Sequence, residues 1–423
     1  MRSRTLCIIG LGYIGLPTAA MFATHGVRVI GIDSNERVVG VLNKGDIHIE
    51  EEGLRELVRK AMGSGNLVVR GKPEPADAFI IAVPTPFKQD KTADMQAVIN
   101  ATEFIVPHLR RGNLVILEST SPPRTTTGLV QPILERSGLT AGKDFQLAYS
   151  PERVLPGQIF LELVANARVI GGVDHASAVA GRDLYSAFVT GEILLTDATT
   201  AEMVKLMENA TRDVNIALAN EFALIAEKLE ISVWEAIKLA NYHPRVKILR
   251  PGPGVGGHCI AIDPWFLVEA APDDAKLIRQ ARLVNDAMPM HTVSLIERAA
   301  AGTTGAVVAC LGLTYKADVD DTRESPAMEI AELLAHKGYV VRVYDPHAPA
   351  PHVRGAHATS SVEEATRGAD VVAVLVDHVE FRTLSPARLS GMRGRSVVDT
   401  RNFLDVDLLR RGGFSVTVLG SAR

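Results

Sequence analysis

The segment that most constrains the fold is TLCIIGLGYIG, in which Gly10, Gly12 and Gly15 follow a short apolar run. A helix-forming stretch continues to about residue 25, and a second apolar run, VRVIGID, ends at Asp33. A G-x-G-x-x-G motif between a strand and a helix, with an acid about 20 residues later, is typical of a dinucleotide-binding βαβ unit. It predicts an α/β chain built on a parallel sheet with helices on both faces.

Each part of this motif has a physical role in holding a dinucleotide. We expect Gly10 to permit the tight turn, Gly12 to let the pyrophosphate approach the backbone, and Gly15 to let helix and strand pack closely. The helix N-terminus supplies amide donors and the positive end of its dipole to the phosphates. In this interpretation Asp33 accepts the ribose hydroxyls and repels a 2′-phosphate, which favours NAD over NADP. The other cofactor contacts predicted in this unit are Tyr13, Ile14 and Arg37.

Strands and helices continue to alternate beyond this unit. The segments DAFIIAVPTP (77–86), NLVILEST (113–120) and FQLAYSPERVLPG (145–157) are predicted strands that end in polar or proline-rich loops. Ligands of open parallel sheets bind beyond the carboxyl ends of the strands. The candidate cofactor or substrate contacts at this edge are therefore Pro84, Thr85, Glu118, Thr120, Glu152 and Arg153. The alternative is that Pro84 and Pro86 only terminate a strand.

The pattern changes near residue 199, where apolar residues recur with helical periodicity over about thirty positions. An ordinary globular helix has about 11–12 residues, so a helix this long is expected to link two domains. Lys205, Asn209 and Arg212 fall on one face of it, and the alternative is an ordinary solvated polar face. The sequence SVWE at 232–235 fits a capping box that opens the next helix.

From about residue 303 the α/β pattern restarts. GAVVACLGL and YVVRVYDPH are predicted strands on either side of the helix SPAMEIAELLAHKG, and ADVVAVLVDH and RSVVDTRN supply two more strands. Residues 311–313 lack the full glycine motif, so this half is expected to bind something other than a second dinucleotide. The predicted fold therefore has two doubly wound Rossmann-like domains, joined by a long central helix and a small helical domain. The expected boundaries are 1–198, 199–300 and 301–423.

Composition excludes several kinds of partner. The net charge of −4 gives no electrostatic reason to expect nucleic acid. No segment approaches the ~18 consecutive apolar residues of a membrane span. Glycines interrupt the N-terminal apolar run, which lacks the cleavage pattern of a signal peptide. Three cysteines are too few and too scattered for a disulfide framework. We therefore expect a soluble cytoplasmic protein with reduced thiols.

One of the three cysteines has an unusual setting. Cys7 and Cys310 lie in short apolar runs and are predicted to be buried, whereas Cys259 lies in PGPGVGGHCIAIDPWFL. A glycine-rich loop gives a thiolate access and nearby backbone N–H donors. His258 is expected to point elsewhere, because adjacent side chains usually face different sides, and Asp263 is a better partner. We therefore interpret Cys259 as a nucleophile.

A dinucleotide domain together with an exposed thiol predicts a specific oxidation. A thiolate adds to an aldehyde, the thiohemiacetal transfers a hydride to NAD⁺, and water releases the resulting thioester as a carboxylate. Lys205 and Asn209 are expected to stabilise the oxyanion, and removing one such donor typically costs ~2.7–4 kcal/mol. Asp263, or an ordered water near it, is the expected base. No metal ion is expected.

The chain resembles the nucleotide-sugar 6-dehydrogenase family, which contains UDP-glucose dehydrogenase. The similarity extends essentially end to end, through GLGYIGLP, VPTP, EST, SPERVLPG, TAEMVKLMENATRDVNIALANE, GPGVGGHCIAIDPWF and DDTRESPAMEI. Within the family, HPRVKILRPGPGVGGHCIAIDPWF and PERVLPGQ are most similar to the UDP-N-acetyl-D-mannosamine dehydrogenases, which convert the sugar's C6 alcohol to a carboxylate with two NAD⁺. The resemblance implies this activity, with UDP-N-acetylglucosamine and UDP-glucose as alternative substrates.

The resemblance also implies catalytic roles. Cys259 matches the thiol nucleophile, and Asp263 matches the acid that assists water activation. Lys205 and Asn209 match the pair on the oxyanion side. The other catalytic residues implied, near the reacting centre and the nicotinamide, are Glu152 and Thr120.

The remaining implied contacts concern the nucleotide and a second subunit. Arg323 matches a contact to the cofactor pyrophosphate, and Lys316 and Arg401 match basic contacts of a C-terminal UDP-binding domain. Arg245 matches an arginine that reaches the partner subunit's sugar, and His243 is expected to recognise the N-acetyl group. The family forms dimers through the long central helix. Further substrate contacts in this interpretation are Glu152, Arg153, Lys205, Asn209 and Gly256.

Two departures argue against glucose as the substrate. UDP-glucose dehydrogenases commonly carry a lysine just before the acid, where this chain has Ile262, and their loop before the cysteine contains fewer prolines. Two other functions stay open. A two-electron β-hydroxyacid dehydrogenase has a similar Lys-x-x-x-Asn pair but no second α/β domain. An NAD-binding redox sensor would use Cys259 as an oxidisable switch.

Overall fold

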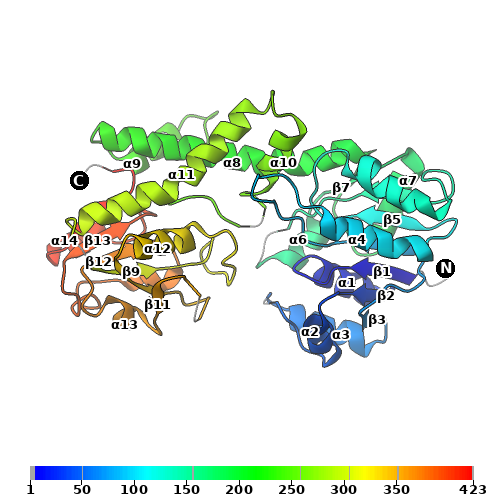
Figure 1. The fold of residues 1–423 in the computed structure, drawn as a ribbon, viewed down its shortest axis with the longest axis horizontal. Helices are drawn as coiled ribbons and strands as arrows, with labels where there is room; N and C mark the ends of the chain where they lie inside the picture. Colours follow the sequence, from blue (N-terminus) through cyan, green and yellow to red (C-terminus); the bar gives the residue numbers. More distant parts are fainter. Residues whose placement is uncertain are drawn as a thin grey trace. The chain divides into compact units, whose positions relative to one another are not determined.

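The computed structural model describes residues 5–49, 51–154, 157–257, 259–303, 305–349 and 352–421. The chain forms two compact units, Met1–Glu208 with Trp265–Asp274, and Asn209–Pro264 with Ala275–Arg423. Each unit contains one sheet with helices on both faces, which confirms the predicted fold class (Figure 1). The segment 199–300 is divided between the two units, so the three domain boundaries stay a prediction.

The sheet of the first unit has eight strands in the order β3-β2-β1-β4-β5-β6-β7-β8. Neighbouring strands are parallel except for β6 and β7. Because β1 lies between β2 and β4, the topological switch point is at its carboxyl end, where the glycine motif begins. The strands are β1 (Thr5–Ile9), β2 (Arg28–Ile32), β3 (Leu67–Arg70), β4 (Ala78–Ile81), β5 (Leu114–Leu117), β6 (Gln146–Tyr149), β7 (Arg168–Gly172) and β8 (Ile193–Asp197).

Burial on both faces explains why these strands are nearly continuous apolar runs. In β1, Leu6 and Ile8 enter one core while Cys7 and Ile9 enter the other. The first core is covered by α1 (Gly15–Thr24), α2 (Glu36–Asn43), α3 (Leu54–Gly63), α6 (Ile159–Ala165) and α7 (His175–Tyr185). The second is covered by α4 (Gln96–Ile105) and α5 (Gln131–Leu134).

The second unit repeats this plan with six parallel strands in the order β11-β10-β9-β12-β13-β14. Its switch point lies at the carboxyl end of β9, between β10 and β12. The strands are β9 (Val307–Leu311), β10 (Val340–Tyr344), β11 (Ala356–Ala358), β12 (Val371–Val374), β13 (Ser396–Asp399) and β14 (Ser415–Val418). One face is covered by α11 (Lys276–Ala299) and α12 (Pro326–His336), and the other by α13 (Val362–Thr366) and α14 (Val406–Arg411).

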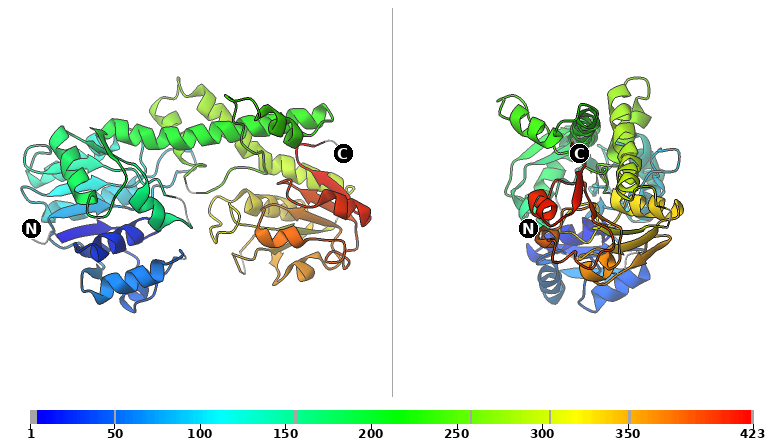
Figure 2. Two further views of the ribbon diagram at one scale, coloured as in Figure 1. Left: turned by 180° about the vertical axis from the view of Figure 1, so that it is seen from behind. Right: turned by 90° about the vertical axis from the view of Figure 1, so that its left-hand side faces the viewer.

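The predicted long helix is present as α8 (Ala198–Lys228), whose 31 residues run without interruption (Figure 2). It is followed by α9 (Val233–Ala240), and α10 (Asp263–Ala270) begins after the cysteine loop. Ser232 caps α9 by accepting a hydrogen bond from the amide of Glu235, as the SVWE motif predicts. Among the described helices, none combines the length and the apolar character that a membrane crossing requires.

Candidate active site

The turn after β1 has the geometry that the glycine motif predicts. Gly10 has a φ of +96°, in the left-handed region that favours glycine. A Cβ on Gly15 would overlap the carbonyl oxygen of Gly10, so only glycine lets α1 begin this close to β1. At Gly12 none of the described residues, apart from its chain neighbours, places an atom within 4 Å of the Cβ position. The backbone there is open to a ligand, which fits a pyrophosphate at the N-terminus of α1.

Asp33 is fixed beside this turn. Its Oδ2 accepts a hydrogen bond from the amide of Leu11 at 3.1 Å, and its Oδ1 accepts one from the amide of Asn35 at 2.8 Å. Asn35 in turn caps α2 by accepting from the amide of Arg37, whose side chain is exposed. The other predicted contacts in the turn, both half-buried, are Tyr13 and Ile14.

The loops after β4 and β5 are joined at the same edge of the sheet. The Thr85 hydroxyl donates to the carbonyl of Thr120 at 2.6 Å. Ser119 Oγ accepts from the amide of Val83 at 2.9 Å and donates to its carbonyl at 2.7 Å. The structure therefore brings together Thr85 and Thr120, which are half-buried, and the exposed Pro84.

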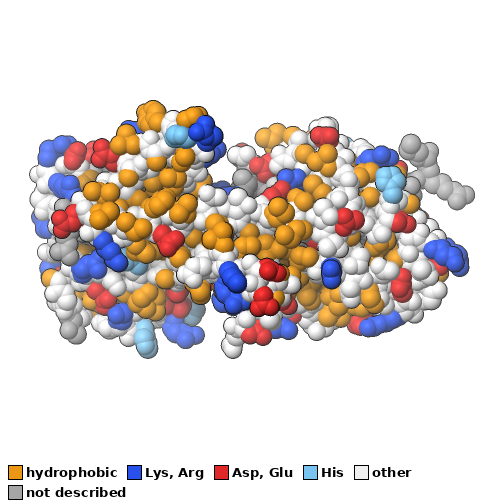
Figure 3. Space-filling model, turned by 90° about the horizontal axis from the view of Figure 1, so that it is seen from above, with side chains coloured by type: hydrophobic (Ala, Val, Ile, Leu, Met, Phe, Trp, Pro, Cys, Tyr) orange, Lys and Arg blue, Asp and Glu red, His pale blue; other side chains and the backbone are white. Residues whose placement is uncertain are grey.

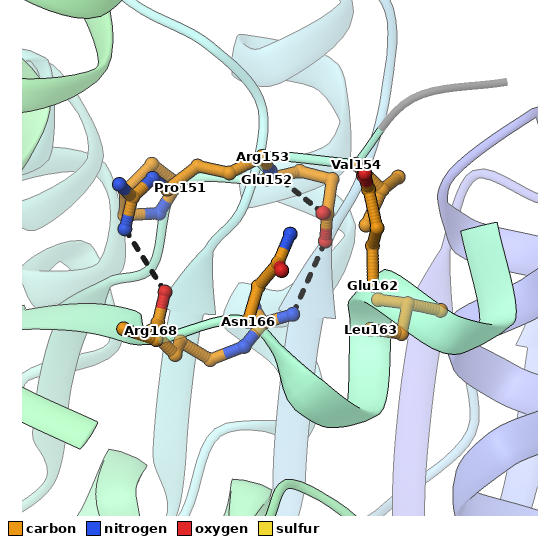
Figure 4. Close-up of a pocket in the computed structure, with 9 residues that line it drawn as sticks. Pro151, Glu152, Arg153, Val154, Glu162, Leu163, Asn166 and Arg168 are labelled. Atoms are coloured by element: carbon orange, nitrogen blue, oxygen red, sulfur yellow. Dashed lines mark hydrogen bonds and ion pairs between the residues drawn. The ribbon is translucent and has the colours of Figure 1, made fainter. Parts of the chain in front are cut away.

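Glu152 belongs to a buried charged network (Figure 4). Arg168, the first residue of β7, donates to Glu152 at 3.2 Å and to Glu118 at 3.4 Å. It also donates to Ser150 Oγ at 3.0 Å. The Tyr185 hydroxyl donates to the same oxygen of Glu118 at 2.8 Å, and the Arg168 guanidinium lies 4.3 Å from the Tyr185 ring centroid. One guanidinium thus forms ion pairs with two buried carboxylates.

The electrostatics of this network follow from its charges. Burial, and then the negative charge of Glu152, raise the pKa of Glu118 from 4.5 to about 7, although Arg168 and Tyr185 oppose the shift. The pKa of Arg168 is also raised, because the carboxylates outweigh its burial. Glu118 faces these interior partners, so its side chain is not presented to a ligand as the sequence suggested.

Two further predicted residues of the first unit lie at α8. Arg153 forms an ion pair with Glu208 of α8 and donates to the carbonyl of Ala167 at 2.9 Å. Lys205 is buried on α8, and its ammonium makes no hydrogen bond or ion pair with the described residues. A buried ammonium without a carboxylate partner is suited to an anionic ligand.

In the second unit, predicted residues of the cysteine loop and of α8 form a compact group. Asn209, on α8, donates from Nδ2 to Oδ2 of Asp263 at 2.5 Å. Asp263 is the first residue of α10, and its amide donates to the carbonyl of Cys259 at 2.8 Å. The structure therefore brings together the nucleophile, the acid and the amide that the sequence singled out.

The three cysteines differ as predicted. Cys7 and Cys310 are fully buried, and burial raises the pKa of each thiol to about 12. Neither forms a thiolate near neutral pH. Cys259 is half-buried in its loop. His258 lies outside the described residues.

Three predicted cations lie on the loops at the carboxyl edge of the second sheet. Lys316 and Arg323 follow β9 and are both exposed, and Arg401 follows β13. Arg323 pairs with Asp321 at 2.6 Å, and Arg401 donates to Asp377 at 3.1 Å. Such an edge is suited to the phosphates of a nucleotide.

Asp345 occupies the place in the second sheet that Asp33 has in the first. Its Oδ2 accepts from the amide of Leu313 at 2.6 Å and lies 3.0 Å from Nε2 of His378. Burial opposes ionisation, but these hydrogen bonds lower the pKa of Asp345 to about 2. Its Oδ1 accepts from the amides of His347 and Ala348, and the side chain is only 3% exposed, so it is closed to a ribose hydroxyl. This agrees with a ligand other than a second dinucleotide.

A possible metal-binding group, Asp318, His347 and His378, has its ligand atoms within 4.8 Å of one another. The Nδ1 of His378 already accepts from the amide of Asp318 at 3.0 Å, and Nε2 is bonded to Asp345. Because both ring nitrogens are engaged, the group is poorly suited to a metal.

Three family models match the chain in order. They describe the NAD binding domain of the UDP-glucose/GDP-mannose dehydrogenase family at 4–189, its central domain at 199–287 and its UDP binding domain at 309–406. The chain belongs to the UDP-glucose/GDP-mannose dehydrogenase family. The predictions of this family, of an NAD cofactor and of a dehydrogenase are therefore confirmed.

Similar relatives of this dehydrogenase differ in the sugar that their names carry. A UDP-N-acetyl-D-mannosamine dehydrogenase from Methanocaldococcus jannaschii is 49% identical, over 99% of the chain and 97% of the relative. An NDP-N-acetyl-D-galactosaminuronic acid dehydrogenase from Ralstonia nicotianae is 48% identical, over 94% of the chain and 96% of the relative. The solved structure of a UDP-D-ManNAc dehydrogenase from Pyrococcus horikoshii has a TM-score of 0.93 and 42% identity, over 99% of both chains.

Three residues of this dehydrogenase that support predicted ones were missed from the sequence. Arg168 opens the apolar strand RVIGG, and a lone charge in such a run indicates a buried ion pair, so its signal was present. Tyr185 and Tyr315 carry no comparable signal, because their partners are distant in sequence.

The predicted substrate contacts His243 and Arg245 are both exposed after α9.

Proposed function

We propose that this dehydrogenase oxidises the C6 alcohol of UDP-N-acetyl-D-mannosamine to the carboxylate of UDP-N-acetyl-D-mannosaminuronate, with two NAD⁺ consumed per sugar. The relatives named for this sugar match nearly the whole chain. The proline-rich cysteine loop argues against glucose, as the resemblance to the family implied. UDP-N-acetylglucosamine and UDP-glucose are the alternatives.

In this mechanism the Cys259 thiolate carries the sugar between the two oxidations. NAD⁺ held at the glycine turn after β1 would supply the hydride acceptor for both oxidations. The first converts the alcohol to an aldehyde and releases a proton. The sulfur then adds to the aldehyde carbon, and loss of the second hydride gives a thioester. Water adds to the thioester, the C–S bond breaks, and the thiolate leaves as the carboxylate forms.

The hydrogen bond between Asn209 and Asp263 is the observation that best supports this mechanism. It fixes the carboxylate at the start of α10, while the backbone of the same turn fixes Cys259. We assign Asp263 to water activation and the buried ammonium of Lys205 to the oxyanion. Glu152, held by Arg168, lies near the reacting centre in this proposal. The residues assigned to NAD are Gly10, Gly12, Tyr13, Ile14, Gly15, Asp33, Arg37, Pro84, Thr85, Thr120 and Arg323. Those assigned to the UDP-sugar are Glu152, Arg153, Gly256, Lys316 and Arg401.

The decisive test is the stoichiometry of NADH. With limiting UDP-N-acetyl-D-mannosamine we expect two NADH per sugar, and we expect Cys259→Ser to form no acid. One NADH with free aldehyde as the final product would favour a two-electron dehydrogenase. No turnover on any sugar in a panel of UDP-hexoses would favour a redox sensor. The panel also identifies the preferred hexose.

We further propose that the chain forms a homodimer through α8. An apolar stripe at helical spacing is exposed on this helix, formed by Leu218, Phe222 and Ile225, and Leu229 continues it directly after the helix; the four side chains are 37–63% exposed. Figure 3 views the molecule from above Figure 1 and shows apolar side chains among charged ones on that face. Such an unpartnered stripe suits a second copy. In this arrangement the exposed His243 and Arg245 contact the sugar bound by the partner.

Light scattering tests the dimer. We expect twice the chain mass for the unmodified protein and a monomer for Phe222→Asp. An unmodified protein that is monomeric at micromolar concentration would contradict the proposal. A cytoplasmic location is also part of the proposal, because three scattered cysteines are too few for a disulfide framework and suit a reducing compartment.

A further inference from the structure

The two glycines that precede the catalytic loop's cysteine pack directly on Tyr315. A Cβ on Gly257 would lie 2.8 Å from Cε2 and 2.9 Å from Cδ2 of that ring, and the φ of Gly257 is +88°. A Cβ on Gly256 would lie 3.0 Å from Cβ of Tyr315 and would overlap the carbonyl oxygen of Glu324. The amide of Gly257 donates to the carbonyl of Arg323 at 3.2 Å. The loop lacks side chains here because the segment 312–325 fills that space.

The start of the loop is also fixed against the second unit. Gly254 has a φ of +142°, and a Cβ on it would lie 2.8 Å from Cβ of Pro326. Gly252 lies against the guanidinium of Arg401, and its amide donates to the side chain of Asn220 at 2.9 Å. The tyrosine ring therefore contacts Gly256 and Gly257, three and two positions before Cys259, in a loop whose start is anchored.

The segment that contains Tyr315 also carries residues that we have assigned to nucleotides, Lys316 to the UDP-sugar and Arg323 to NAD. Lys316 follows Tyr315 directly, and Arg323 lies in the same loop, which the hydrogen bond from the amide of Tyr315 to the carbonyl of Asp321 closes at 3.0 Å. Burial, and then the charges of Asp321 and Cys259, raise the pKa of the Tyr315 phenol.

We propose that Tyr315 is a positioning residue for Cys259, and that a nucleotide diphosphate held by the segment 312–325 steadies the Cys259 loop through the Tyr315 ring. The inference rests on the proposed role of Cys259 as nucleophile. Tyr315 acts through the glycine backbone and makes no bond to reacting atoms. Binding of the nucleotide is thereby coupled to the position of the Cys259 thiol.

The test measures the rate at which iodoacetamide alkylates Cys259, by mass spectrometry of its peptide, with and without saturating UDP. Cys7 and Cys310 are buried internal controls. Tyr315→Ala is expected to raise the rate without UDP about fivefold, which corresponds to about 1 kcal/mol of lost loop restraint. Tyr315→Phe keeps the ring and should react like the unmodified protein.

UDP is expected to slow alkylation of the unmodified protein. Most of this slowing should disappear in Tyr315→Ala, in which calorimetry verifies that UDP still binds. Equal protection in both proteins would show direct shielding and overturn the coupling. An unchanged or lower rate in Tyr315→Ala without UDP would overturn the positioning role.

Two variants keep the test independent of general damage. Tyr339→Leu removes another partly buried tyrosine of the same unit and should leave the rate unchanged. Gly257→Ala places a Cβ against the ring from the loop side. Its effect on the alkylation rate should therefore be smaller when it is combined with Tyr315→Ala than alone. The labelling does not need turnover. If Cys259→Ser still formed acid, the proposed function would fail while the labelling result stood.

Discussion

The network around Arg168 makes a quantitative prediction for Glu118→Gln. In the folded chain the pKa of Glu118 is raised from 4.5 to about 7. Between these values the folded chain holds a proton that the unfolded chain has released. The free energy of unfolding therefore falls by about 1.4 kcal/mol per pH unit as the pH rises. From pH 5 to pH 7 this group costs the unmodified protein about 3 kcal/mol at most. Glutamine has no proton to lose and removes this slope.

Hydrogen exchange of the β5 amides, Leu114–Leu117, measures the effect within the first unit and does not require the whole chain to unfold in one step. At each pH the exchange rates of variant and unmodified protein are divided, which cancels the intrinsic pH dependence of exchange. We expect the unmodified protein to exchange relatively faster by about tenfold per pH unit between pH 5 and pH 7.

The control is Glu103→Gln, which removes an exposed carboxylate of the same unit that pairs with Arg136. Its rate ratio should not change with pH over this range. A ratio for Glu118→Gln that is equally constant between pH 5 and pH 7 would refute the assignment of a buried proton to Glu118.

Two other predictions concern the cofactor turn and the oxyanion. Gly15→Ala should destabilise the first unit by about 1–3 kcal/mol, because its Cβ overlaps the Gly10 carbonyl. Gly12→Ala should weaken NAD binding, measured by calorimetry, at unchanged stability, measured by thermal melts. Equal melting temperatures for Gly12→Ala and Gly15→Ala would contradict this contrast. Lys205→Ala should lower kcat about 10²–10³-fold with a small change in KM, as for a lost oxyanion donor. A kcat within tenfold of the unmodified value would exclude that role.

The sequence predicted the first half of the fold well because its signals are local. The glycine motif, the strand that ends at Asp33 and the helical period of α8 each depend on residues within about thirty positions, which a single pass along the chain can recognise. The buried setting of Cys7 and Cys310 followed from the same kind of pattern.

What could not be predicted depends on contacts between distant segments. Glu118 looked like a ligand contact because it ends a strand, but Arg168 and Tyr185 enclose it from 50 and 67 positions away. The packing of Tyr315 on Gly257 joins two loops and leaves no periodic trace in either. Such contacts decide which polar residue faces a ligand and which one supports it.

The most direct test of the mechanism is to trap the covalent intermediate in Asp263→Asn. This variant is expected to complete both hydride transfers and then stall, because its water is no longer activated. After acid quenching, mass spectrometry should find the nucleotide-sugar acyl group on the peptide that contains Cys259, with two NADH formed per active site. An unmodified Cys259 peptide during continued acid formation, or an acyl group on another residue, would contradict the account.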